Sequence, residues 1–365
     1  MSETVDGASN FTYRLSMQNQ FLSKNKKGIN IILFIGSFLV SFFLLEILTR
    51  YIFPPPPVPR NVSGIYNFAD YKIYDTGLVA FDEDLGWVNK PYARGYGMFG
   101  EYLSFDSMGF RENGNTKTLR NRPVILAIGD SYTLGVEVDN ADTWPSRLEL
   151  KSGIKVLNGG VGGYGLDQML TRTTSVLKKM TVDYVIVAFI LEDIHRVKQI
   201  RQYSILKPHY TLQNNNLVSS KVKLGDYPPT DYFKKILGYS YVVHLFMTGL
   251  FKDYWSKGGI SDMAYADIDE MEVSFKIIDA FVNLAEDGKL KGMIFIALPS
   301  CYGDLSLVNH PVTQHIKKIT EKNSRVFLID MQTDLLNIKI FQGGRDAEIH
   351  ALFNDSTKGY HGHFS

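Results

Sequence analysis

The chain has 365 residues, 45% of them hydrophobic, so it is long enough to form one large or two modest hydrophobic cores. Its 39 basic and 38 acidic residues nearly balance, which argues against nucleic acid as a partner. The single cysteine, Cys301, excludes an intramolecular disulfide and a cysteine-ligated metal cluster, and we expect it to be a partly buried small side chain.

Residues 28–53 form an apolar segment in which the first charged residue is Glu46. This segment is long enough to cross a bilayer, and it predicts a transmembrane helix. A cleaved signal peptide is the alternative, but its apolar core would be shorter and would end at a small-residue cleavage site. The basic residues Lys24, Lys26 and Lys27 precede the span, so the positive-inside rule predicts a cytoplasmic N-terminus and an extracytoplasmic domain.

The regions on either side of this span differ in composition. Residues 1–27 are polar and without apolar periodicity, so we expect a disordered cytoplasmic tail. Residues 54–61 contain four consecutive prolines, which end a helix and form a stiff spacer. Residues 62–120 are rich in Tyr, Phe and Gly, and we expect a lead-in region of loops and short strands.

Residues 121–365 show short apolar runs that alternate with amphipathic segments, which is the pattern of a parallel sheet covered by helices. The predicted strands are Val124–Ile128, Lys155–Leu157, Tyr184–Ile190, Met293–Leu298 and Val326–Ile329. The predicted helices are Thr143–Leu150, Gln168–Lys178, Glu270–Glu286 and Pro311–Glu321. This order predicts an α/β fold with a flavodoxin-like, doubly wound parallel sheet of about five strands. Residues 199–262 interrupt the pattern, and we expect an insertion over one end of the sheet.

The strongest local signal is the segment from Val124 to Gly135, where a predicted buried strand runs into Gly129-Asp130-Ser131. A tight turn at the carboxyl end of a strand would present the Ser131 hydroxyl to a substrate. The alternative is a serine that only caps the following helix. The lipase pattern G-x-S-x-G is not met, because Thr133 occupies the second glycine position.

Several sequence blocks together resemble the SGNH/GDSL hydrolase family, in its membrane-anchored bacterial form. GDSYTLG at residues 129–135 matches the family's first block, so the resemblance implies that Ser131 is the nucleophile. NGGVGGYG at residues 158–165 is similar to the second block, in which Gly163 would offer its backbone N–H to the oxyanion. The resemblance also implies an SGNH hydrolase fold and activity on ester bonds.

The block that would supply the catalytic histidine lies near the C-terminus. GHFS at residues 362–365 resembles it, which makes His363 the expected general base. In the family an aspartate two or three residues earlier usually orients this histidine, but Tyr360 and His361 stand at those places here. Asp355 is the nearest acidic residue that could take this role. Loss of the orienting carboxylate from a serine triad can cost about 10⁴ in rate.

A second departure concerns the oxyanion site. The family's third block is Gly-Asn-Asp after a strand, and its asparagine amide donates to the oxyanion, but this chain has Leu191-Glu192-Asp193 there. An ionised Glu192 cannot donate, and loss of one such donor costs about 10²–10³ in rate. Upstream, LGW at residues 85–87 and GFR at residues 109–111 are similar to the lead-in of membrane-anchored members.

Two other interpretations use the same residues. Residues 160–165 fit the dinucleotide pattern G-x-G-x-x-G, but the acidic residue expected at the end of the next strand is missing, because Asp183 precedes that strand. His195 with Glu192 and Asp193 has poor geometry for a metal site, and a solvated strand end explains these residues better. We expect no cofactor and no bound metal.

Two classes of function remain open. The first is an extracytoplasmic serine ester hydrolase or O-acyltransferase that acts on acyl esters, of envelope glycans for example, through a Ser-His mechanism. The second is a catalytically degenerate SGNH domain that binds glycan or a membrane O-acyltransferase. The intact Gly-Asp-Ser block and His363 favour the first, whereas Glu192 and the missing aspartate favour the second. The expected partners are an acylated small-molecule or glycan substrate and the membrane, with the membrane O-acyltransferase as the partner in the second case.

Overall fold

The computed structural model describes most of the chain. The described residues are 5–53, 77–97, 100–114, 120–202, 205–223, 232–256, 264–299 and 307–333. Contacts within the chain divide it into two compact units, of which the first comprises Met1–Pro56 and Ser240–Leu250 and the second Pro57–Tyr239 and Phe251–Ser365. The predicted proline spacer and the predicted histidine block lie outside the described residues.

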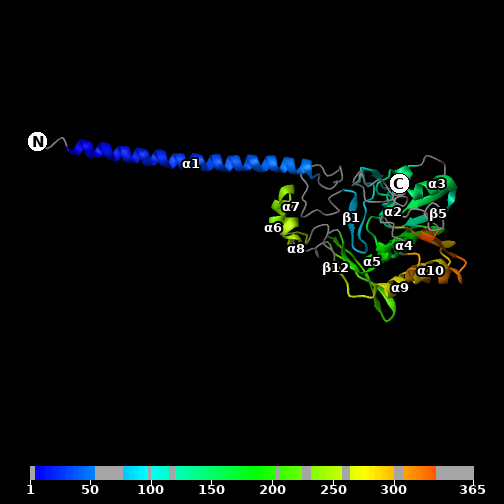
Figure 1. Ribbon diagram of the computed structural model, residues 1–365. Helices are drawn as coiled ribbons and strands as arrows, with labels where there is room; N and C mark the ends of the chain where they lie inside the picture. Colours follow the sequence, from blue (N-terminus) through cyan, green and yellow to red (C-terminus); the bar gives the residue numbers. More distant parts are fainter. Residues whose placement is uncertain are drawn as a thin grey trace, which may run out of the picture. The chain divides into compact units, whose positions relative to one another are not determined.

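The first unit is built on helix α1 (Val5–Ile52), which is continuous over 48 residues (Figure 1). Its part from Gly28 to Ile52 contains an 18-residue window with a mean hydropathy of 2.6 and is long and apolar enough to cross a membrane. The prediction of an apolar helix here is confirmed. The expectation of a disordered segment 1–27 is wrong from Val5 onward, where the chain is helical. No proline interrupts this segment, and a helix that has nucleated gains one backbone hydrogen bond for each residue added.

The second unit contains a five-stranded parallel sheet with the order β14-β13-β7-β5-β6. Its strands are β5 (Arg120–Ile128), β6 (Ile154–Asn158), β7 (Tyr184–Phe189), β13 (Gly292–Ala297) and β14 (Val326–Asp330). In this order β6 lies on one side of β5, and β7, β13 and β14 follow in turn on the other side of β5. This is the flavodoxin-like, doubly wound order. The predicted fold class is therefore confirmed, and each predicted strand overlaps an observed one.

Alternating side chains give each face of this sheet its own core. Leu126 and Val187 belong to the cluster shared with helices α4 (Leu166–Lys179), α9 (Glu270–Glu286) and α10 (Pro311–Thr320). Ile125 and Ile186 point to the other face, where they contact Leu148 of α3 (Trp144–Ser152). The four predicted helices are therefore present, and they cover both faces of the sheet.

Register brings the ends of the central strands to one edge. Ala127 of β5 lies beside Asn158 of β6, Ile128 beside Val187 of β7, and Phe189 beside Ala297 of β13. The chain therefore leaves β5, β6 and β7 at the same edge of the sheet, which is where ligands bind in folds of this class.

The remaining elements are short. Before the sheet come the hairpins β1 (Val79–Asp82) with β2 (Gly86–Asn89) and β3 (Arg94–Tyr96) with β4 (Tyr102–Ser104), so the lead-in contains the expected short strands. The insertion comprises β8 (Gln199–Gln202), β9 (Ile205–Leu206), β10 (Tyr210–Gln213), β11 (Asn216–Ser219), α6 (Tyr232–Leu237), α7 (Tyr241–Leu250) and α8 (Lys252–Ser256), and β12 (Ala264–Tyr265) follows it. The β10–β11 hairpin contacts α9, whereas α7 belongs to the first unit with α1.

Candidate active site

Ser131 is the first residue of the short helix α2 (Ser131–Leu134), three residues after the inner strand β5 ends. The N-cap of α2 is Asp130, whose side chain accepts a hydrogen bond from the Tyr132 N–H at 2.9 Å. The alternative that Ser131 is only a helix cap is therefore wrong, because Asp130 has that role. The Ser131 hydroxyl is partly buried and lies 3.4 Å from the Asp130 carboxylate.

Buried charged side chains stabilise this turn. The carboxylates of Asp130 and Asp193 are both fully buried. One guanidinium nitrogen of Arg196, Nη1, donates to Asp193 at 2.5 Å, to Asp130 at 3.2 Å and to the Tyr164 carbonyl at 3.3 Å. Burial and the nearby Asp130 carboxylate raise the pKa of Asp193 well above its usual range. Arg196 thereby connects the nucleophile turn to the segments after β6 and β7.

Asp193 lies in the short helix α5 (Leu191–His195), where it also accepts a hydrogen bond from the Ile190 N–H at 2.9 Å. The expectation that Glu192, Asp193 and His195 form a solvated strand end is wrong for Asp193. The reason is that a carboxylate can be buried when a cation and an N–H donor compensate it, and the sequence does not reveal that Arg196 turns back to do so. His195 is half-exposed and pairs with Glu270 at 2.8 Å.

The glycine-rich segment after β6 packs directly on the nucleophile turn. The Val161 N–H donates to the Gly129 carbonyl at 3.1 Å. A Cβ atom on Gly160 would lie only 2.2 Å from the Leu134 nitrogen, so only glycine fits at this contact. Gly163 has a φ of +77° and its N–H makes no hydrogen bond to any residue that the structure describes. This N–H is therefore available as a donor in the predicted oxyanion site.

The first lead-in segment, residues 85–87, holds this glycine-rich segment in place. The fully buried Trp87 donates its indole N–H to the Gly162 carbonyl at 2.9 Å, and its backbone carbonyl accepts from the Tyr164 hydroxyl at 2.6 Å. The Gly162 carbonyl and the Gly163 N–H belong to one peptide plane and point in opposite directions. The hydrogen bond from Trp87 therefore fixes the direction of the Gly163 N–H.

The second lead-in segment, residues 109–111, holds the other end of helix α2. Arg111 is 2% exposed and donates through Nη1 to the carbonyls of Leu134 at 2.8 Å and Gly135 at 2.5 Å. Both lead-in segments therefore position the blocks that carry Ser131 and Gly163. The sequence comparison with the SGNH/GDSL family selected these segments, but it did not indicate this role.

Glu192 lies on α5, the helix that begins directly after β7. Its side chain is partly buried, and its Oε2 atom is buried with no hydrogen-bond partner among the described residues. Ser131, Gly163 and Glu192 thus follow three neighbouring strands of the sheet. His363 and Asp355 lie outside the described residues, so their roles remain predictions. Within the described ranges, no group of three or more metal-binding side chains is present.

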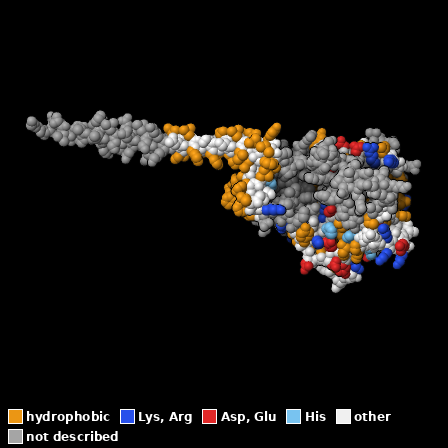
Figure 2. All heavy atoms as spheres, viewed as in Figure 1, with side chains coloured by type: hydrophobic (Ala, Val, Ile, Leu, Met, Phe, Trp, Pro, Cys, Tyr) orange, Lys and Arg blue, Asp and Glu red, His pale blue; other side chains and the backbone are white. Residues whose placement is uncertain are grey.

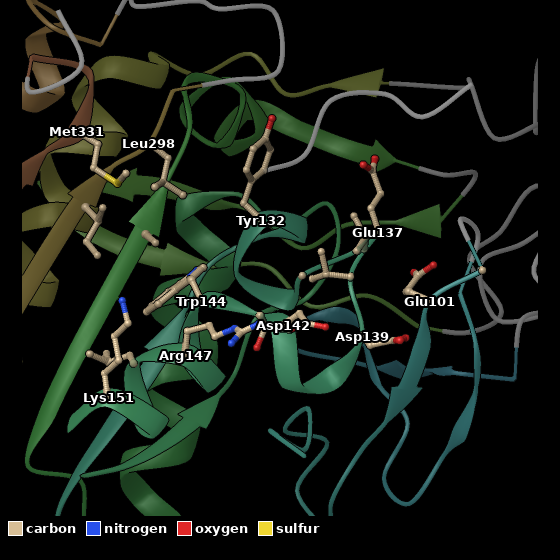
Figure 3. Close-up of a pocket in the computed structure, with 18 residues that line it drawn as sticks. Glu101, Tyr132, Glu137, Asp139, Asp142, Trp144, Arg147, Lys151, Leu298 and Met331 are labelled. Atoms are coloured by element: carbon tan, nitrogen blue, oxygen red, sulfur yellow. Dashed lines mark hydrogen bonds and ion pairs between the residues drawn. The ribbon is translucent and has the colours of Figure 1, made fainter. Parts of the chain in front are cut away.

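A pocket of about 950 Å³ lies beside the turn, on the α3 face of the sheet (Figure 3). Trp144, Arg147 and Lys151 of α3 line one wall, and Leu298 and Met331 lie at the strand ends opposite. Of the candidate site, only the neighbouring residue Tyr132 reaches this pocket; Ser131, Gly163 and Glu192 are not among its described lining residues. The pocket is therefore distinct from the candidate oxyanion site.

Comparisons with known proteins complete this description. No protein-family model matches the chain, and no curated protein matches it. Similar solved structures include a variant of an acetylxylan esterase from Geobacillus stearothermophilus, with 13% identity and a TM-score of 0.32, covering 64% of this chain and 86% of that one. A lipolytic G-D-S-L family protein from Veillonella parvula has 14% identity and a TM-score of 0.32, covering 66% and 89%. AlinE4, an SGNH-hydrolase family esterase, has 14% identity and a TM-score of 0.30, covering 63% and 86%.

The sheet order described above is the one that the resemblance to SGNH/GDSL hydrolases predicts.

Proposed function

We propose that the chain is a serine ester hydrolase or O-acyltransferase, anchored by helix α1, with Ser131 as its nucleophile. The observation that carries this proposal is the division of roles at the turn. Asp130 caps α2 and pairs with Arg196, so the Ser131 hydroxyl, one residue later, is not needed as the cap. The nearby Gly163 N–H supports the proposal, because acyl transfer needs a donor for the oxyanion.

In this mechanism the Ser131 oxygen attacks the carbonyl carbon of an acyl ester. A serine hydroxyl is a weak nucleophile at neutral pH and needs a base within about 2.6–3.2 Å, for which we propose His363. The backbone N–H groups of Ser131 and Gly163 would receive the oxyanion. The leaving alcohol takes the proton from the histidine, and an acyl-serine ester remains. Water or a sugar hydroxyl then attacks this ester, which gives hydrolysis or transfer.

The proposed substrate class is an acylated envelope glycan, met outside the cytoplasm. The basic residues before the span, Lys24, Lys26 and Lys27, support this placement because they favour a cytoplasmic N-terminus. We propose an uncleaved anchor instead of a signal peptide, since the 25-residue apolar stretch from Gly28 to Ile52 exceeds the usual apolar core of a signal peptide.

A fluorophosphonate probe tests the proposal directly on the full chain in detergent. We expect the probe to label Ser131, the label to vanish in Ser131→Ala, and labelling to fall sharply in His363→Ala. Ser152→Ala, at the end of α3, is the matched control and should label like the wild type. A folded wild-type protein that remains unlabelled and does not cleave an acyl-nitrophenyl ester would overturn the proposal.

One observation favours the second function, a degenerate domain that binds glycan or a membrane O-acyltransferase. Glu192 places a carboxylate where the family has an amide donor, and one of its oxygens is buried without a partner among the described residues. If the chain is an enzyme held back by this carboxylate, Glu192→Asn should raise esterase activity, by up to about 10²–10³ if a full oxyanion donor is restored. Glu192→Gln, which removes the charge but keeps the length, is the control. Loss of activity in the asparagine variant would show that Glu192 has a positive role.

A further inference from the structure

Helix α7, which follows strands β8–β11 and helix α6 of the insertion, belongs to the same compact unit as α1. Along the last turns of α1, the side chains that are partly buried are Phe42, Glu46, Thr49 and Arg50. Their spacing of four, three and one residues places them on one face of the helix. This face is where α7 packs, and most of the other described side chains from Gly28 to Ile52 are exposed.

Glu46 makes this contact specific. Its carboxylate accepts hydrogen bonds from the N–H groups of Tyr241 at 2.7 Å and Val242 at 3.1 Å and from the Ser240 hydroxyl at 2.8 Å. Arg50, one turn later, donates to the same carboxylate at 2.7 Å. Glu46 therefore caps the start of α7 together with Ser240, whose hydroxyl accepts from the Val243 N–H at 3.2 Å, because both satisfy N–H groups that have no partner within the helix.

This contact explains why an acidic residue stands in an apolar span. A charged side chain at bilayer depth is costly unless it is paired, and such residues are usually functional. Here the charge is compensated by two backbone N–H groups, a hydroxyl and a guanidinium, all within hydrogen-bond distance. The compensation requires that the start of α7 lies at the depth of Glu46, which is six residues before the end of α1.

The outer surface of α7 is apolar. Leu245, Phe246 and Leu250 are 37%, 58% and 65% exposed. At ten residues, α7 is about 15 Å long, which is half the thickness of the hydrocarbon core. It is therefore too short to cross a bilayer, but its length fits one leaflet. Figure 2 shows hydrophobic side chains covering the described surface of the α1 span, and the exposed side chains of α7 continue this surface.

We propose that α7 is embedded in the membrane beside the C-terminal turns of α1, in a single leaflet, with Phe246 and Leu250 against lipid acyl chains. The proposal rests on membrane anchoring by α1. The polar groups near the same level fit an interfacial position, since Arg50 lies 5.9 Å from the ring of Tyr241, which stacks on His244.

Depth-dependent fluorescence quenching tests this position. The full chain is prepared with Cys301→Ser, so that one new cysteine carries the fluorophore, and is reconstituted into lipid nanodiscs. The test site is Phe246→Cys. Leu44→Cys on the exposed face of α1 is the reference for lipid, and Asn216→Cys in the exposed β10–β11 hairpin is the reference for water. The quenchers are lipids with a spin label on the acyl chain and, separately, aqueous iodide.

We expect the probe at Phe246 to be quenched by the labelled lipid as strongly as the probe at Leu44, and to be protected from iodide. Adding Glu46→Gln removes the charge that caps α7, so lipid quenching at Phe246 should fall while quenching at Leu44 remains. Iodide quenching at Phe246 equal to that at Asn216 would overturn the proposal. A Phe246 probe shielded from both quenchers would also overturn it, in favour of a protein contact.

The reference probe at Leu44 and the labelling of Ser131 distinguish a failure of this inference from a failure of the membrane anchor or of the catalytic proposal. If the probe at Leu44 is also accessible to iodide, the membrane anchor is wrong, and the inference fails with it. Fluorophosphonate labelling of Ser131 in the same nanodiscs reports the catalytic proposal through a different readout.

Discussion

Asp130 and Ser131 are neighbours in sequence, yet their surroundings give them different tasks. Asp130 is fully buried, caps α2 and pairs with Arg196, so its carboxylate is committed to holding the turn. Ser131 is partly buried at the start of the same helix. At the scale of single residues, the site therefore consists of one partly buried reactive group beside a buried, charged support, and the residues that hold this support can be tested by mutation.

Trp87→Phe tests whether the indole positions the oxyanion donor. The substitution keeps an aromatic ring but removes the hydrogen bond to the Gly162 carbonyl, so the Gly163 N–H should lose its fixed direction. We expect kcat for an acyl-nitrophenyl ester to fall about tenfold, equivalent to ~1.4 kcal/mol, with little change in KM. Trp255→Phe, at a buried tryptophan in α8, is the matched control. A rise in KM with kcat unchanged would contradict this role.

Asp193 predicts a pH dependence of stability. Its pKa is raised in the folded protein by burial and by Asp130, whereas an unfolded aspartate releases its proton near pH ~3.9. Between these two values the folded state holds more protons, so the free energy of unfolding falls as the pH rises. Asp193→Asn cannot titrate and should reduce this fall, which urea unfolding of the full chain in detergent at several pH values would measure. An identical slope in the variant would show that other groups cause the pH dependence.

At the scale of elements, one buried ion pair joins the insertion to the helix that follows the glycine-rich segment. Lys207, directly after β9, contacts the carboxylate of Asp167 in α4, and both side chains are almost completely buried. Burial raises the pKa of Asp167 and lowers that of Lys207, so each charge depends on the other. The pair therefore fixes the start of α4, the helix that begins just after Gly163 and Gly165.

Removal of one partner should cost more than removal of both charges. Lys207→Met leaves a buried carboxylate unpaired, and we expect a loss of about 3–5 kcal/mol in the free energy of unfolding. Lys207→Met combined with Asp167→Asn should recover most of this loss. Lys221→Met, which breaks an exposed ion pair with Asp84, is the control and should have little effect. A double variant no more stable than Lys207→Met would show that the lysine stabilises the fold by packing alone.

At the scale of the whole molecule, the orientation of the chain across the membrane is a prediction from charge. The basic residues before the span should remain in the cytoplasm, so the second unit should lie outside. Protease added to cells with a permeabilised outer layer should then digest the second unit, detected with an antibody to it, and a tag at residue 1 should survive. A protected second unit with a digested N-terminal tag would refute this orientation.

Local sequence pattern is enough to predict several parts of this protein. Apolar runs of strand length and amphipathic segments of helix length predict all five strands and four helices of the sheet layer, because their periodicity repeats over a few residues. Gly28–Ile52 is recognised as an apolar helix for the same reason. The Gly-Asp-Ser turn follows from its place after a buried strand. Together these signals suffice for the fold class and the candidate nucleophile.

The contacts that hold these parts in position join residues far apart in the sequence and are visible only in the folded chain. The hydrogen bond from Trp87 to Gly162 joins residues 75 positions apart, and the bond from Tyr241 to Glu46 spans 195. Neither has a periodic signal, because a hydrogen bond between two distant segments imposes no repeating pattern on either segment. The prediction that Asp193 is solvated was wrong for the same reason. Its burial depends on the Arg196 side chain turning back towards Asp130, and only the folded chain brings these three side chains together.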